Sequence, residues 1–151
     1  MTIHSGAGER LVRNRAALTA TDWQLLIAAA LAQVAAAAAL RVMPLTTLQA
    51  RAARFRRLAQ AAMRGSDDRV IWAIQVTGRR LAGLSTCLVR ALVVDLVLDS
   101  PGRPLCLTIG VRRTADGALD AHAWVEREGR VLIGTTSDTY VPLVGWDSHC
   151  A

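Results

Sequence analysis

The sequence of 151 residues predicts an α+β fold, in which N-terminal helices are followed by an antiparallel β-sheet. Two observations carry this prediction. Apolar residues recur at helical spacing through the first hundred residues, where caps, glycines and prolines divide the chain into segments. After Pro101 the pattern changes to short alternating runs that are separated by turns. We therefore expect one domain over residues 21–148, with a helical half over about 21–100 and a sheet half over about 104–145, preceded by a flexible segment 1–20.

Four helices are expected in the first half. Ser, Thr and Asp residues favour helix starts, and Gly or Pro residues favour helix ends. These signals bound helices from Thr21-Asp22 to before Pro44, from Thr46 or Thr47 to Gly65, from Ser66-Asp67-Asp68 to about Leu81, and from Cys87 to about Leu98.

Three or four strands are expected in the second half. Turn residues at 114–117 and 127–130 separate apolar runs whose period is typical of strands. The expected strands are residues 105–113, 119–126 and 131–133, with a short fourth strand over residues 140–144.

The positive charge of the chain comes entirely from arginine. The formal net charge is +6, all 18 basic residues are Arg, and none is Lys, which is typical of a GC-rich bacterial coding sequence. The densest group lies between Arg51 and Arg64 and contains one aromatic residue, Phe55. Because nucleic-acid sites usually need several stacking side chains, this group is better interpreted as a solvated helix face.

Residues 25–40 are apolar except for Gln33. As a helix these 16 residues reach about 24 Å, against about 30 Å of membrane hydrocarbon. Much of the segment is alanine, so we expect a packed interior helix and no stable membrane span. Residues 1–22 also lack the apolar core of a secretory signal. Together these features favour a cytoplasmic protein.

The three cysteines do not form a recognisable framework. Their number is odd and no C-x-x-C motif is present, which argues against disulfides and against a structural zinc site. Cys106 lies in a strand-like run and is expected to be a small core residue, and Cys150 is expected to be free. No metal or other cofactor is expected.

Cys87 and His122 are the candidate catalytic pair. Thr86 is a good N-cap, so the Cys87 sulfur falls in the first helical turn, where the helix dipole favours the nucleophilic thiolate. His122 is the only histidine away from the chain ends, and it shares a strand face with Trp124. A thiolate at a helix start with a histidine on a later strand is the layout of papain-like and transglutaminase-like cysteine enzymes.

Five segments of the chain carry a family resemblance. They are LRVMPL (40–45), STCLVRAL (85–92), LTIGVRR (107–113), AHAWVE (121–126) and GRVL (129–132). Together they resemble the lasso-peptide leader peptidases, the transglutaminase-like B-proteins of lasso-peptide biosynthesis. The resemblance covers most of the chain from about residue 22, and the histidine block is its most specific part.

The resemblance implies a cysteine peptidase that removes the leader from a ribosomally made precursor before macrolactam closure. It also implies two partners, a RiPP recognition element protein that binds the leader and an asparagine-synthetase-like cyclase. In some relatives the recognition element is fused at the N-terminus, whereas here the first helix is expected near residue 22, so a separate recognition protein is expected.

The resemblance further implies a third catalytic residue, an aspartate on the strand after the histidine. Folding the hairpin about residues 128–129 places Thr135 roughly opposite His122, and no carboxylate stands there. Asp138 is the first candidate and Asp120 the alternative. A hydroxyl group or a backbone carbonyl is also able to orient the ring, because the orienting group mainly fixes the tautomer and direction of the imidazole.

Other functions stay open on the sequence alone. The same pair is able to transfer an acyl group to an amine instead of water, and the fold is able to serve as a non-catalytic binding module. An oxyanion hole needs the Cys87 backbone N–H and a second donor. Gln75 and Trp72 are candidates for that donor, although a scaffold role suits both better.

Overall fold

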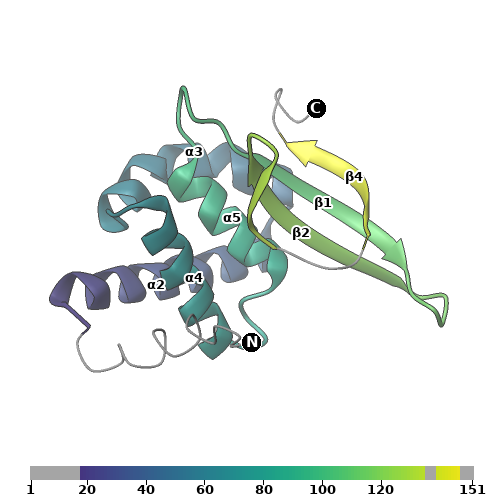
Figure 1. The fold of residues 1–151 in the computed structure, drawn as a ribbon, viewed down its shortest axis with the longest axis horizontal. Coiled ribbons are helices and arrows are strands. Elements are labelled where there is room, and N and C mark those ends of the chain that lie inside the picture. The colour runs from purple at the N-terminus through teal and green to yellow at the C-terminus, as the bar shows by residue number, and fades with distance from the viewer. Residues whose placement is uncertain (1–17, 135–138, 147–151) are drawn as a thin grey trace, which may run out of the picture.

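The computed structural model describes residues 18–134 and 139–146, and the expected fold class is confirmed. Figure 1 shows the helices gathered at one end of the molecule and the β1–β2 hairpin extending away from them. The described elements are α2 (Ala20–Val42), α3 (Leu45–Ala62), α4 (Asp67–Arg80), α5 (Cys87–Leu98), β1 (Cys106–Arg113), β2 (Leu119–Arg127), β3 (Arg130–Ile133) and β4 (Val141–Trp146). The predictions for residues 1–17, Asp138 and Cys150 lie outside the described residues.

The start of α2 differs from the prediction by two residues. The N-cap is Thr19, whose Oγ1 accepts a hydrogen bond from the Asp22 backbone N–H at 3.2 Å. The Asp22 carboxylate in turn accepts one from the Thr19 backbone N–H at 3.0 Å, which completes a capping box. Asp22 is therefore the third residue of the helix and not part of its cap.

The sheet is antiparallel in the order β3-β2-β1-β4. Leu107 of β1 pairs with Val125 of β2, and both are fully buried together with Ile133 of β3. These residues belong to the same core as the buried residues of α5, so one face of the sheet packs on that helix. Burial of each such side chain contributes about 1.5–3 kcal/mol.

α5 is the central helix of the fold. It contacts α2, α3 and α4 as well as β1, β2 and β3, and its sequence CLVRALVVDLVL is apolar on most sides. A helix that is apolar all round is stable only when surrounded, and here the other helices and the sheet supply that cover. The first residue of this enclosed helix is Cys87.

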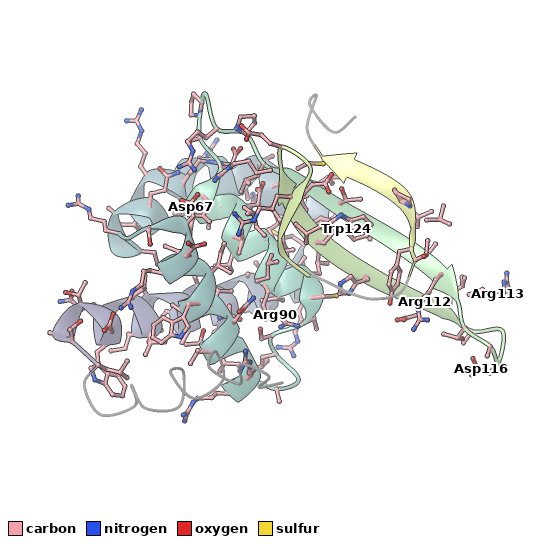
Figure 2. All side chains as sticks on the ribbon, viewed as in Figure 1. Asp67, Arg90, Arg112, Arg113, Asp116 and Trp124 are labelled. Carbon is pink, nitrogen blue, oxygen red and sulfur yellow. The ribbon has the colours of Figure 1, made fainter. Side chains whose placement is uncertain are left out.

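Ion pairs fix the sheet to the start of α4. The Asp67 carboxylate lies in the first turn of α4 and pairs with Arg127 at the end of β2 and with Arg103. The Arg127 guanidinium also donates to the Leu98 carbonyl at 2.8 Å. Figure 2 shows Asp67 in the helical part of the molecule, at the far end from the hairpin tip. These contacts connect α4, the end of α5 and the sheet.

α2 is longer than the apolar run that it contains. α2 has 23 residues, about 34 Å, because the capping box extends it beyond the apolar run. By length and composition it is able to cross a membrane. In the structure Leu25, Leu26 and Ala29 pack in the core, whereas Trp23 and Leu31 are exposed. α2 is thus a core helix with an apolar outer face.

Cys106 corrects a second expectation. It takes part in a disulfide bond, whereas the odd number of cysteines predicted reduced thiols. Cysteine spacing along a chain does not report which thiols a fold brings together. Cys87 is a free cysteine.

Candidate active site

Cys87 occupies the predicted position at the start of α5. The Thr86 side chain caps the helix by accepting a hydrogen bond from the Val89 backbone N–H at 3.3 Å. Cys87 itself is half-buried and packs against the core. The backbone N–H groups of this turn lack partners within the helix, so they favour negative charge beside them. The position suits a nucleophilic thiolate.

His122 lies in the middle of β2, opposite Gly110 of β1. Its Nε2 atom is 2.7 Å from the carbonyl oxygen of Gly134. A carbonyl oxygen only accepts hydrogen bonds, so Nε2 carries the proton in this contact. In the neutral ring the lone pair is then on Nδ1. The contact leaves Nδ1 as the basic atom of the imidazole.

Gly134 is required at its position by two separate features of the backbone. Its φ is +87°, a region that favours glycine. A Cβ at this position would also lie 2.6 Å from the Ala123 carbonyl oxygen. A backbone carbonyl is one of the groups that the sequence allows for orienting the imidazole, and the Gly134 carbonyl is such a group.

Two aromatic rings flank the His122 ring. The Trp124 ring stacks near it, with centroids 6.4 Å apart, and the Tyr140 ring lies 5.2 Å away. Gly110 makes room for both, because a Cβ there would be 2.9 Å from the Trp124 ring and 3.0 Å from Tyr140. Figure 2 shows Trp124 and Arg112 on the sheet. The rings restrict the directions that the imidazole is able to take.

Asp120, the alternative orienting residue, bonds to other groups. Its Oδ2 accepts hydrogen bonds from the Tyr140 hydroxyl at 2.8 Å and from Arg112 Nε at 3.1 Å. The hydrogen bond from Tyr140, and next that from Arg112, hold the pKa of the Asp120 carboxyl below its usual range. Among the described residues no hydrogen bond joins Asp120 to His122. Asp120 therefore bonds to Tyr140 and Arg112, and its interaction with the imidazole is electrostatic without a hydrogen bond.

The register of the β2–β3 hairpin differs from the one expected. Arg127 pairs with Arg130 and Glu126 with Val131, as predicted. A shift between Val125 and Glu126 then pairs Val125 with Ile133, one residue away from the register that places Thr135 opposite His122. Asp138 and Thr135 themselves lie outside the described residues.

The structure brings together the elements that carry the candidate pair. α5 packs against β2, through the face on which Ala123 and Val125 are buried. His122 alternates with these residues along the strand and is thus on the other face. In the described part of the chain no hydrogen bond links the Cys87 thiol to the His122 ring. The catalytic pairing of the two residues stays a prediction.

The two suggested oxyanion donors lie on α4. Trp72 packs against the core, and its ring lies 5.2 Å from the Arg69 guanidinium, which pairs with Asp22. This is a scaffold role. Gln75 is half-buried, and the structure assigns no second oxyanion donor.

The described residues contain no group of three or more His, Cys, Asp or Glu side chains able to hold a metal ion. The sequence does not identify two features of the site, Gly134 as the residue whose carbonyl orients the ring, and Tyr140. For Tyr140 the one available signal is that it is the only tyrosine of the chain.

One comparison with known proteins gives a match. A family model described as the transglutaminase-like superfamily matches residues 30–145, a segment that includes Cys87, His122 and Asp138. No curated protein and no solved structure gives a significant match.

Proposed function

Because the chain belongs to the transglutaminase-like superfamily, we propose that it is a cysteine peptidase that removes the leader from a lasso-peptide precursor. Domains of this superfamily generally carry cysteine-protease or acyltransferase activity. The observation that carries the proposal is the His122–Gly134 contact, because it makes Nδ1 the lone-pair atom of the neutral ring in a fold whose one free described thiol lies at a capped helix start. The segments shared with the leader peptidases support the choice of substrate.

The proposed reaction requires the precursor-bound protein to bring His122 Nδ1 to the Cys87 thiol, because the alternation along β2 places His122 on the face away from Ala123 and Val125. Nδ1 then takes the thiol proton, and the sulfur attacks the scissile carbonyl carbon. The Cys87 backbone N–H stabilises the oxyanion that forms. The imidazolium then protonates the leaving amine, and a thioester remains on Cys87. Water attacks the thioester carbon and gives a proton to the imidazole, and the C–S bond breaks to release the leader as a carboxylic acid that ionises to the carboxylate. The imidazolium returns its proton to the Cys87 thiolate.

The Gly134 carbonyl has a defined part in this sequence. It keeps the proton on Nε2 and holds the ring in one orientation while Nδ1 gains and loses a proton. Such an orienting contact usually comes from a carboxylate or an amide side chain. The resemblance implies an aspartate after the histidine strand in that part. We retain Asp138, the first candidate, as the third catalytic residue, with the carbonyl as an additional support.

The proposal also includes the partners that the resemblance implies. The substrate is the lasso precursor, a recognition element protein delivers the leader, and a cyclase uses the product. The recognition protein raises the effective concentration of the scissile segment at Cys87 without adding chemistry. We place these events in the cytoplasm.

The second candidate is acyl transfer to an amine, because the superfamily includes both activities. The thioester is common to both reactions, and only its acceptor differs. The experiment is mass spectrometry of precursor incubated with the protein and the recognition protein, with and without added methylamine. Free leader carboxylate throughout supports the peptidase, methylamide product supports the transferase, and no product contradicts both. Omission of the recognition protein is expected to slow cleavage.

A further inference from the structure

Gln33 is a buried polar residue in the middle of the apolar helix α2, and the reaction above does not use it. Its side chain is 1% exposed. Leucine would be buried equally well here without any demand for hydrogen bonds, whereas a buried amide with no partners costs about 1–3 kcal/mol. The hydrogen-bond partners of this amide therefore show what it contributes to the structure.

The two ends of the Gln33 amide point to different elements. Its Nε2 donates to the last two turns of α4, to the Ile74 carbonyl at 3.2 Å and to Thr77 Oγ1 at 2.6 Å. Its Oε1 accepts a hydrogen bond from the Ser85 hydroxyl. Ser85 lies between α4 and α5, two residues before Cys87. One side chain thus connects α2, α4 and the segment that leads into the nucleophile.

Gly78 allows these groups to meet. A Cβ on Gly78 would lie 2.8 Å from Ser85 Oγ, 3.0 Å from Gln33 Oε1 and 2.9 Å from Arg90 Cδ. The absence of a side chain therefore lets α4 approach the segment before α5 and the first turns of α5 itself. The junction is closely packed, so Ser85 has little freedom to shift along it.

Thr86, the residue between Ser85 and Cys87, is held by hydrogen bonds with the first turn of α5. The Thr86 hydroxyl caps α5, and its carbonyl accepts from the Arg90 backbone N–H at 3.1 Å and from Arg90 Nε at 3.4 Å. Figure 2 shows Arg90 in α5, close to where this helix begins. The Ser85 backbone N–H donates to the Leu81 carbonyl at 2.9 Å. Ser85 and Thr86 are both anchored immediately before Cys87.

We infer that Gln33, acting through Ser85, is a positioning residue for the Cys87 thiol. The amide fixes where the first turn of α5 begins and hence the direction in which Cys87 projects. Gln33 does not touch the reacting atoms, and its effect is on the geometry of the nucleophile. The inference rests on the proposed function in that it takes Cys87 as the nucleophile.

The test compares two variants that each remove one hydroxyl partner from the same amide. Ser85→Ala removes the partner beside the nucleophile, and Thr77→Val removes the partner on α4. We expect Ser85→Ala to lower kcat for precursor cleavage about tenfold with little change in KM, because small misplacements of a reacting group are costly. Iodoacetamide alkylation of Cys87, followed by peptide mass spectrometry, is expected to slow by a similar factor.

Thr77→Val is expected to lower the melting temperature but to leave both rates within about twofold of the wild type. Gln33→Met, of similar volume, removes the contacts with both hydroxyl groups, and with the Ala29 and Ile74 carbonyls, and is expected to show both effects. If Gln33→Met does not fold, the comparison of Ser85→Ala with Thr77→Val still decides the matter. Equal alkylation rates in the wild type and Ser85→Ala, or equal slowing in Ser85→Ala and Thr77→Val, would overturn the inference.

Alkylation separates this inference from the proposed function, because it needs neither precursor nor partner. Slow alkylation in Ser85→Ala alone, together with a wild type that cleaves no precursor, would contradict the peptidase and support the positioning role. Cleavage by the wild type, together with an unchanged alkylation rate in Ser85→Ala, would support the peptidase and contradict the positioning role.

Discussion

His122 Nε2 and the Gly134 carbonyl oxygen lie 2.7 Å apart, so a backbone group orients the imidazole of the candidate site. This carbonyl comes directly after β3, and its direction depends on a positive φ that only glycine adopts at low cost. The side chain that the reaction needs is thereby coupled to one main-chain conformation.

Gly134→Ala should therefore damage catalysis, because the new methyl group would meet the Ala123 carbonyl and turn the Gly134 carbonyl away. We expect a loss of about 100-fold in kcat/KM for precursor cleavage, measured by mass spectrometry. Gly117→Ala is the matched control, since Gly117 also has a positive φ but nothing within 4 Å of an added Cβ. Similar losses in both variants would show that backbone strain alone is responsible.

The third catalytic residue is tested by three substitutions. His122→Ala should be about as damaging as loss of the cysteine, because members of a catalytic unit fail together. Asp138→Asn should cost less, since the Gly134 carbonyl still holds the ring. Asp120→Asn should cost least, because this carboxylate bonds to Tyr140 and Arg112. A crippled Asp120→Asn beside an unaffected Asp138→Asn would move the orienting role to Asp120.

The Asp120 contacts also predict a dependence of stability on pH. Hydrogen bonds from Tyr140 and then Arg112 lower the pKa of Asp120 from 3.8, its ordinary value. A lowered pKa means that the contribution to stability is present above pH 3.8 and is lost as pH falls through the folded-state pKa. The melting temperature of wild type should therefore exceed that of Asp120→Asn at pH 7, and the gap should narrow below pH 3.8. A gap that is constant with pH would rule out this carboxylate as its source.

The outer face of α2 leads to a prediction about solubility. Because Leu25, Leu26 and Ala29 pack in the core, removal of α2 into a bilayer would expose the helices α3, α4 and α5 that it covers. Cell fractionation should accordingly find most of the protein in the soluble fraction when the recognition protein is co-expressed. Recovery from membranes only after detergent extraction would show that α2 spans them.

Local signals explain which elements were predicted. The bounds of α5 match the prediction at both ends, because a threonine cap and an Asp-Ser-Pro stop are encoded within the helix and its neighbours. The start of α2 was missed because its capping box involves Thr19, whereas the sequence offered a second plausible pair two residues later.

Local sequence patterns do not predict the contacts that hold the site residues in place. A backbone carbonyl such as that of Gly134 has no side-chain signature, and the shift at Val125 and Glu126 alters the register without any turn residue to mark it. Gln33 and Ser85 meet across 52 positions of sequence. Spacing rules find residues that share a helix or strand, and these contacts join different elements.

The central claim is that Cys87 is the nucleophile, and mass spectrometry of the precursor with the recognition protein tests it most directly. Wild type should release leader and core, whereas Cys87→Ala and Cys87→Ser should release neither while keeping the wild-type circular dichroism spectrum. Cys150→Ala should still cleave the precursor, because the reaction uses only the Cys87 sulfur. Undiminished cleavage by a folded Cys87→Ala protein would contradict the account.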